Sequence, residues 1–194
     1  MPKVGMEPIR REALVKATIE EIGAAGSLDV TVARIARRAG VSSALAHHYF
    51  GGKDDILLAA MRHILTVYAR DVRAALRGAE GPRARLEAVI VASFAGQNFR
   101  PEVISTWLGF YVLAQRAPRA SRLLHIYQRR LHANLSHDLR ALVGARAGAV
   151  ASRLAALIDG IYLRQSLGAG APDPETSAHH VLQALAAELR EPLR

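Results

Sequence analysis

The sequence contains no cysteine, which excludes disulfide bonds, thiolate nucleophiles and zinc sites built on sulfur. Aromatic residues are scarce, at 5% of the chain, and the single tryptophan is Trp107. The longest stretch without Asp, Glu, Lys or Arg covers residues 39–52, which is shorter than the roughly 20 apolar residues that cross a bilayer. Residues 1–11 also lack the apolar core of a signal peptide. We therefore expect a cytoplasmic protein without a membrane span.

Alternating runs of Val, Ile and Thr, which are typical of strands, are also missing, whereas Ala, Leu, Arg and Glu are abundant. With 51% hydrophobic and 22% charged residues, the chain has the composition of a folded globular protein. Apolar spacing and the positions of Gly and Pro predict an all-α fold of about nine helices. The predicted helices cover residues 9–25, 31–39, 43–50, 54–77, 82–97, 101–116, 118–143, 147–167 and a final segment capped by residues 173–175.

The formal net charge of +9 invites a nucleic-acid interpretation. However, most of the excess positive charge lies after residue 57, and all basic residues except Lys3, Lys16 and Lys53 are arginine. Bulk charge therefore does not locate a DNA-binding surface.

Residues 31–50 have the layout of a helix-turn-helix. Thr31 is expected to cap the first helix, and Gly40 tolerates the left-handed backbone of the turn. A small apolar core is predicted for Val32, Ile35, Ala36, Val41, Leu45 and Phe50. This packing leaves the outer face of the second helix available for a DNA major groove, and the alternative of an ordinary helical hairpin is less attractive.

The residues expected to read bases on that face are Ser42, Ser43, Ala44, His47 and His48. Those expected to contact phosphates are Thr31, Arg34, Tyr49 and Lys53. A metal site at His47–His48 is not expected, because neighbouring residues on a helix point about 100° apart and neither has a histidine three or four residues away.

The segments 35–42 (IARRAGVS), 48–53 (HYFGGK) and 56–57 (IL) resemble the N-terminal domain of TetR-type transcriptional repressors. Segments 1–11, 107–111 and 156–164 extend this resemblance to the choline-responsive regulators of glycine betaine synthesis within that family, so it covers nearly the whole chain. The recognition helix departs from their pattern at residues 43–47 (SALAH), so the resemblance does not predict the operator sequence.

The resemblance implies a DNA-binding domain at residues 1–57 and an effector-binding and dimerisation domain at residues 58–194. It also implies a homodimer formed by the last two helices, a palindromic operator in double-stranded DNA, and repression of choline uptake and glycine betaine synthesis that choline relieves. Two alternatives stay open. One is a TetR-type repressor with another cationic or hydrophobic effector, and the other is an all-helical ligand-binding protein or enzyme without DNA function.

Aromatic residues suggest where the effector binds, although such clusters form the core in most helical proteins. The expected cage for a quaternary ammonium consists of Trp107, Phe110, Tyr111, Phe99 and Tyr162, with Phe94 and Tyr127 as neighbours. Glu102 or Asp159 could complement the positive charge. Motifs for nucleophilic catalysis, phosphate binding or dinucleotide binding are missing, so we expect no enzyme activity and no cofactor.

Overall fold

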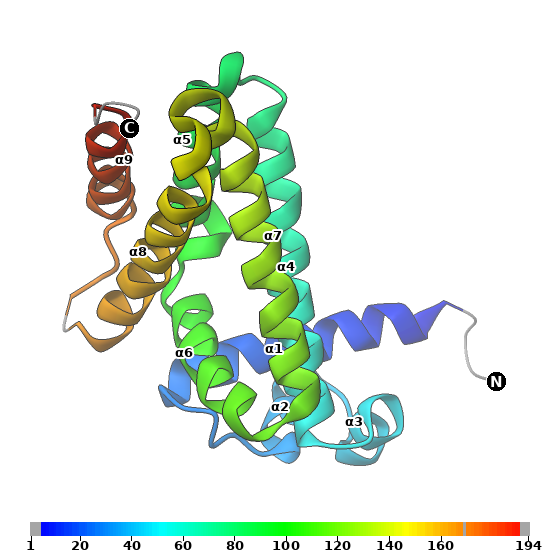
Figure 1. The fold of residues 1–194 in the computed structure, drawn as a ribbon. Helices are drawn as coiled ribbons and strands as arrows, with labels where there is room; N and C mark the ends of the chain where they lie inside the picture. Colours follow the sequence, from blue (N-terminus) through cyan, green and yellow to red (C-terminus); the bar gives the residue numbers. More distant parts are fainter. Residues whose placement is uncertain (1–4, 169, 191–194) are drawn as a thin grey trace.

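The computed structural model describes residues 5–168 and 170–190, and over these residues the chain is all-α, as predicted (Figure 1). Nine α-helices and two short 3-10 helices account for the described secondary structure. They are α1 (Met6–Ala25), α2 (Val32–Arg38), α3 (Ser43–Phe50), α4 (Lys53–Leu76), α5 (Gly81–Phe94), η1 (Gly96–Phe99), α6 (Pro101–Arg116), α7 (Pro118–Val143), η2 (Gly144–Arg146), α8 (Ala147–Leu167) and α9 (Pro174–Arg190).

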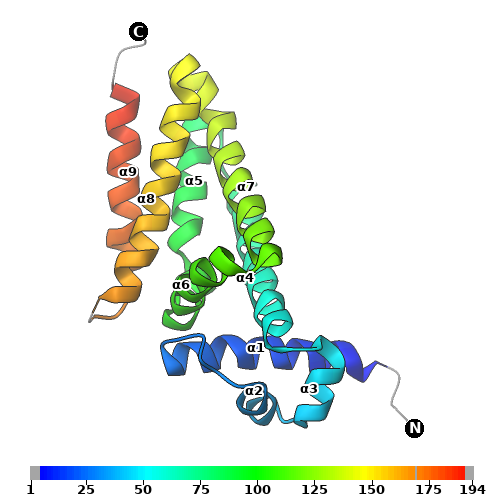
Figure 2. The same ribbon diagram turned by 60° about the horizontal axis from the view of Figure 1, so that its bottom comes forward.

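The first three helices gather at one end of the molecule, with α2 and α3 beneath α1 (Figure 2). Helix α4 begins in this group and runs away from it into the larger C-terminal part. It therefore crosses the domain boundary expected near residue 57 and joins the two parts as one continuous rod.

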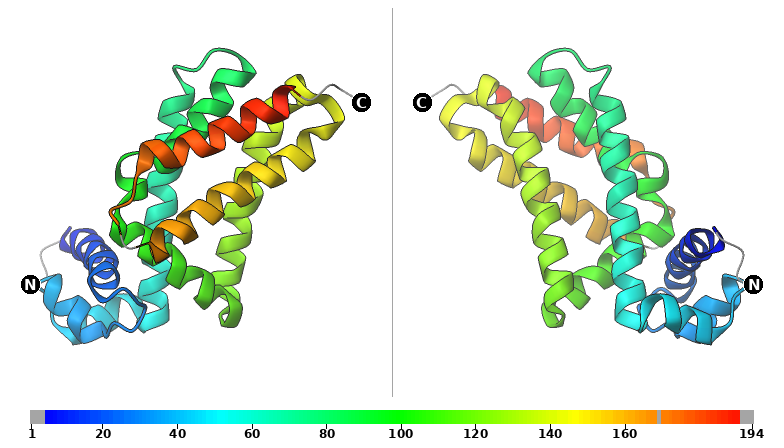
Figure 3. Two further views of the ribbon diagram at one scale, coloured as in Figure 1. Left: turned by 90° about the vertical axis from the view of Figure 1, so that its left-hand side faces the viewer. Right: turned by 90° about the vertical axis from the view of Figure 1, so that its right-hand side faces the viewer.

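The C-terminal part is a bundle in which α5, α6, α7 and α8 share one core with α4. Helix α9 packs on α5 and α8, and it lies on the side of the bundle away from α4 (Figures 1 and 3). Helix α6 is the layer between this bundle and α1, and it contacts both.

Several helix boundaries agree with the sequence where a proline or a glycine marks them. Pro101 and Pro118 occupy the first turns of α6 and α7, and the ranges 101–116, 118–143 and 147–167 are confirmed. The predicted helix 82–97 is too long. It ends at Phe94 because Gly96 has a left-handed backbone (φ 54°), after which η1 forms a separate turn.

One stretch within Pro118–Leu167, with a mean hydropathy of 1.5, is long and apolar enough to cross a membrane by length and composition alone. The structure divides this stretch into two helices, because Gly144 has a φ of 57° and the 3-10 turn η2 follows it. Helices α7 and α8 then pack against each other. The apolar residues thus belong to two different helices of one bundle.

Candidate DNA-binding surface and effector cavity

The helix-turn-helix is built from two capped helices. The Thr31 hydroxyl accepts a hydrogen bond from the Arg34 amide (3.2 Å) at the start of α2, and the Ser42 hydroxyl accepts one from the Leu45 amide (3.2 Å) at the start of α3. Gly40, with a φ of 68°, makes the turn between them. Ile35, Ala36 and Ala46 are buried in the shared core, so the opposite face of α3 points to solvent.

All five residues predicted to read bases are exposed on this face: Ser42, Ser43, Ala44, His47 and His48. Ser43 and Ala44 stand one helical turn before His47 and His48. Ser42 differs from the others, because its hydroxyl oxygen is occupied as the cap of α3. The His48 ring lies against Tyr49, with 5.6 Å between the ring centroids.

The residues predicted to contact phosphates surround α3. Lys53 begins α4, is 39% exposed in its side chain, and has its ammonium 3.8 Å from a carboxylate oxygen of Asp29. Tyr49 is half-buried, and the guanidinium of Arg11 sits 5.3 Å above the centre of its ring. Both side chains therefore flank the exposed face of α3.

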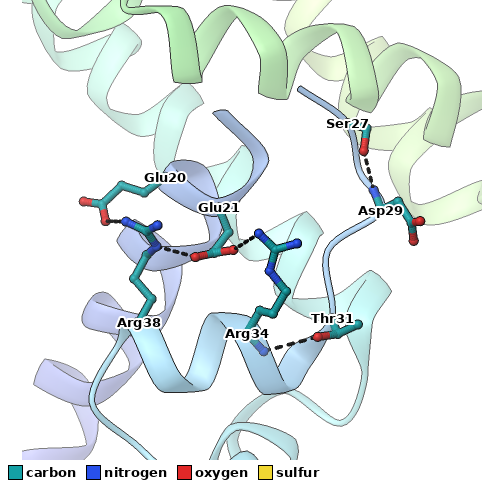
Figure 4. Close-up of polar contacts among 7 residues, drawn as sticks. All are labelled: Glu20, Glu21, Ser27, Asp29, Thr31, Arg34 and Arg38. Atoms are coloured by element: carbon teal, nitrogen blue, oxygen red, sulfur yellow. Dashed lines mark hydrogen bonds and ion pairs between the residues drawn. The ribbon is translucent and has the colours of Figure 1, made fainter. Parts of the chain in front are cut away.

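Arg34, also predicted to contact phosphate, forms an ion pair within the protein. Its guanidinium lies 2.9 Å from Glu21 of α1, a residue that is only 6% exposed, and Arg38 donates to the same carboxylate at 2.5 Å (Figure 4). The hydrogen bond from Arg38 holds the pKa of Glu21 below its usual value. In the structure, Arg34 and Arg38 therefore anchor α2 to α1, and Arg34 is directed at a carboxylate of the protein.

A second site lies inside the C-terminal bundle, where α4, α5, η1, α6, α7 and α8 enclose a cavity of about 10 Å³. This volume is close to the minimum that holds one water molecule. The lining residues are Ile64, Tyr68, Ser93, Asn98, Trp107, Tyr111, Tyr127, Ile158, Asp159 and Tyr162. Aromatic rings make up half of this lining.

Trp107 is at the centre of the aromatic group. Its ring centroid lies 4.7 Å from that of Tyr127, 5.7 Å from Tyr111 and 6.2 Å from Tyr162. Tyr68 adds a further ring, 6.2 Å from Tyr127. The rings come from α4, α6, α7 and α8, so the cage forms only when these helices assemble.

Asp159 supplies the one carboxylate among the cavity residues. It accepts hydrogen bonds from the hydroxyl of Tyr127 (3.1 Å) and from that of Tyr111. Burial raises the pKa of Asp159, and these two hydrogen bonds oppose the rise. No residue that lines the cavity is basic, so an ionised Asp159 has no countercharge there. The cavity therefore favours a cation that can also contact aromatic rings.

Four of the seven predicted ligand-binding residues line the cavity: Trp107, Tyr111, Tyr162 and Asp159. Phe99 and Phe110 do not. They lie behind the cage, with ring centroids 5.1 Å from Tyr162 and 6.3 Å from Trp107, respectively.

Glu102 also lies outside the cavity. Its carboxylate is 3.3 Å from Arg100, and its backbone abuts Gly23 of α1. Sequence reasoning missed three residues that line the cavity, Tyr68, Ser93 and Asn98. The helical spacing of apolar residues in α4 places Tyr68 on the inward face but does not show what it faces. No sequence signal marks Ser93 or Asn98.

A helix-turn-helix with an exposed second helix, joined by a long helix to a helical bundle, is the arrangement of a class of DNA-binding transcriptional regulators. Two family models match the chain. "Bacterial regulatory proteins, tetR family" matches residues 14–60, and "BetI-type transcriptional repressor, C-terminal" matches residues 82–190. The chain therefore belongs to the TetR family, with a C-terminal domain of BetI type, and it is a DNA-binding transcriptional repressor.

Curated relatives agree with this assignment. The HTH-type transcriptional regulator BetI of Brucella suis is 51% identical over 97% of this chain and 96% of its own, and that of Agrobacterium fabrum is 52% identical over 86% and 82%. Among solved structures, a putative transcriptional regulator from Saccharomonospora viridis in complex with choline has a TM-score of 0.79 at 23% identity, covering 91% of this chain and 95% of that one. These relatives are transcriptional regulators, not enzymes.

Proposed function

We propose that this repressor controls genes for choline uptake and glycine betaine synthesis and that choline releases it from its operator. The observation that carries the proposal is the half-buried Asp159 carboxylate in a cage of aromatic rings, with no basic residue in the cavity lining. A quaternary ammonium would supply the missing positive charge and would be attracted to the ring faces, at about 0.5–2 kcal/mol for each favourable contact. The names of the BetI relatives, and the choline bound to the S. viridis regulator, support this choice of effector.

Choline is several times larger than a water molecule, so the cavity must expand when choline binds. The expansion has to displace at least one wall, and α6 contributes two of the largest side chains, Trp107 and Tyr111. Protein interiors are close-packed, so the displacement would pass to whatever lies behind the moving helix.

Helix α1 lies behind α6, and two glycines bring these elements unusually close. A Cβ atom on Gly23 of α1 would stand only 2.3 Å from the Cβ of Glu102, and one on Gly109 of α6 would stand 2.5 Å from Leu28, in the loop that follows α1. With so little space at this contact, α1 would follow α6, and the helix-turn-helix that packs on α1 would move with it. Choline then releases DNA if it binds better to the conformer whose recognition helices are wrongly spaced.

The spacing matters because the protein is proposed to act as a homodimer through α8 and α9. Both helices lie away from α4, and Leu163 and Leu167 of α8 are 43% and 71% exposed, which provides apolar surface for a second subunit. Two subunits would present their α3 helices to successive turns of the major groove, about 34–36 Å apart, on a palindromic operator.

The effector proposal can be tested with the fluorescence of Trp107, because it is the single tryptophan and lines the cavity. Titration with choline should change its emission with a saturating curve. The uncharged isostere 3,3-dimethylbutan-1-ol, which replaces the nitrogen by carbon, should bind at least tenfold more weakly. In Asp159→Asn, the preference for choline over the isostere should decrease, and the aromatic rings should account for the preference that remains. Equal affinity of the wild type for both compounds would contradict the proposed role of Asp159.

The regulatory proposal needs DNA. A gel shift with the DNA upstream of the gene for this protein should show a complex that choline dissociates and that the isostere leaves intact at the same concentration. If the complex resists choline but dissociates with a different quaternary ammonium compound, the proposal of a ligand-released repressor stands and the choice of choline as its effector is wrong. Failure to bind any upstream fragment would contradict the proposed target genes.

A further inference from the structure

The hydrogen bond of His47 determines which atom of its ring can meet DNA. His47 is exposed on α3, and its Nδ1 lies 2.9 Å from the backbone oxygen of Gly51. A carbonyl oxygen can only accept a hydrogen bond, so Nδ1 carries the hydrogen and donates it. In the neutral ring, Nε2 is then left with a lone pair and no hydrogen.

Gly51 forms two hydrogen bonds with His47, one through its amide and one through its carbonyl. Its amide donates to the His47 carbonyl at 2.7 Å and closes the end of α3, while its own carbonyl receives the ring. The φ of Gly51 is 77°, in the left-handed region that favours glycine. The local turn thus fixes the orientation of the ring and its hydrogen position before DNA binds.

We infer that His47 reads an exocyclic amino group in the major groove, which is N6 of adenine or N4 of cytosine, with Nε2 as the acceptor. The inference rests on the proposal that α3 occupies the major groove. Phosphate oxygens, guanine O6 and N7, and thymine O4 are all acceptors and cannot pair with a lone pair. The amino groups of adenine and cytosine are the donors that a major groove offers. Neutral His47 is therefore a base reader and not a phosphate contact.

Every base pair exposes one amino group in the major groove, so a preferred sequence alone does not test the inference. The operator would first be selected from a random duplex library with the wild type and with His47→Ala. The position whose base preference disappears in the variant identifies the pair that His47 contacts. His48→Ala serves as the matched control and should keep the preference at that position.

The amino group at that position would then be removed, by replacing adenine with purine or cytosine with 2-pyrimidinone. Wild-type affinity should fall about fivefold, the value of one hydrogen bond, while His47→Ala should bind both duplexes equally. His47→Gln, whose side-chain oxygen accepts, should keep the dependence on the amino group and shows whether the loss in His47→Ala is specific.

Wild-type binding that is unchanged by removal of the amino group, but is weakened by a 7-deazapurine at the same pair, would show that the ring donates instead, and the inference would be wrong. If the wild type bound no duplex from the library, the operator proposal itself would fail, and this outcome is distinct from the previous one.

Discussion

Replacement of Gly23 by alanine tests the proposed mechanical link between the effector cavity and the DNA-binding domain. The new Cβ would stand 2.3 Å from the Cβ and 2.7 Å from the Cα of Glu102, where carbon atoms normally lie about 3.5–4.0 Å apart. Because one of these atoms is backbone, a rotamer change cannot remove the overlap. Helices α1 and α6 must therefore separate by more than about 1 Å at this point.

The expected stability change combines two opposing effects. Overpacking of this kind costs about 2 kcal/mol, and alanine recovers up to about 1 kcal/mol because it favours a helix more than glycine does. The net loss of about 1 kcal/mol should lower the melting temperature by about 3 °C in a protein of this size. Gly148→Ala in α8 is the matched control, because nothing lies within 4 Å of its added Cβ, and it should raise the melting temperature slightly.

The functional consequence of Gly23→Ala follows from linkage. If the separation of α1 and α6 resembles the change that choline causes, operator affinity should fall and choline affinity should rise. Thermal unfolding, anisotropy of labelled operator DNA and Trp107 fluorescence would measure these effects. A variant as stable as Gly148→Ala, with unchanged affinities, would refute the close α1–α6 contact and the coupling built on it.

Three other changes test separate parts of the molecule. Burial raises the pKa of Asp159, so the wild type without choline should lose stability as the pH rises from the ordinary aspartate range through the raised pKa. Over the same pH range, its affinity for choline should increase. Thermal unfolding and Trp107 fluorescence measure the two trends, and Asp159→Asn should show neither. Lys53→Ala should weaken binding to all duplexes and reduce the slope of log affinity against log salt concentration by about one. Asp29→Asn should strengthen binding, because it removes the carboxylate that pairs with Lys53. An unchanged slope in Lys53→Ala would show that Lys53 does not contact phosphate. Glu21→Gln should weaken the packing of α2 on α1 and lower the melting temperature. Because the pKa of Glu21 is lowered in the folded protein, the difference in melting temperature between wild type and variant should shrink as the pH falls through that pKa. A difference that does not change with pH would argue against the ion pairs.

Local sequence signals predicted the helices and the exposed face of α3 well, because each depends on neighbouring residues. Thr31 and Ser42 cap their helices as a hydroxyl before a helical run should. The alternation of buried Ala46 with exposed His47 follows from helical spacing alone.

The cavity could be predicted only in part, because its walls are far apart in the sequence. The aromatic spacing on α6 indicated Trp107 and Tyr111, yet no local pattern shows that Tyr68 of α4 faces them across the bundle. Glu102 is a plausible countercharge until the close approach of Gly23 is known. Similarly, the ion pair between Arg34 and Glu21, thirteen residues earlier, depends on how α2 packs on α1 and has no local sequence signal.

The tyrosine hydroxyls of the cage have a further consequence for chemical selectivity. Tyr162 donates to the carbonyl oxygens of Ser93 and Asn98, Tyr127 donates to Asp159, and Tyr68 shares a hydrogen bond with Ser93. A primary amine that entered the cage would exchange the water around its N–H groups for ring faces, the Asp159 carboxylate and the remaining lone pairs of these hydroxyls. A trimethylated nitrogen has no such groups to satisfy. Choline, which loses less hydration on entry, should therefore bind more tightly than ethanolamine, even though both carry the same charge.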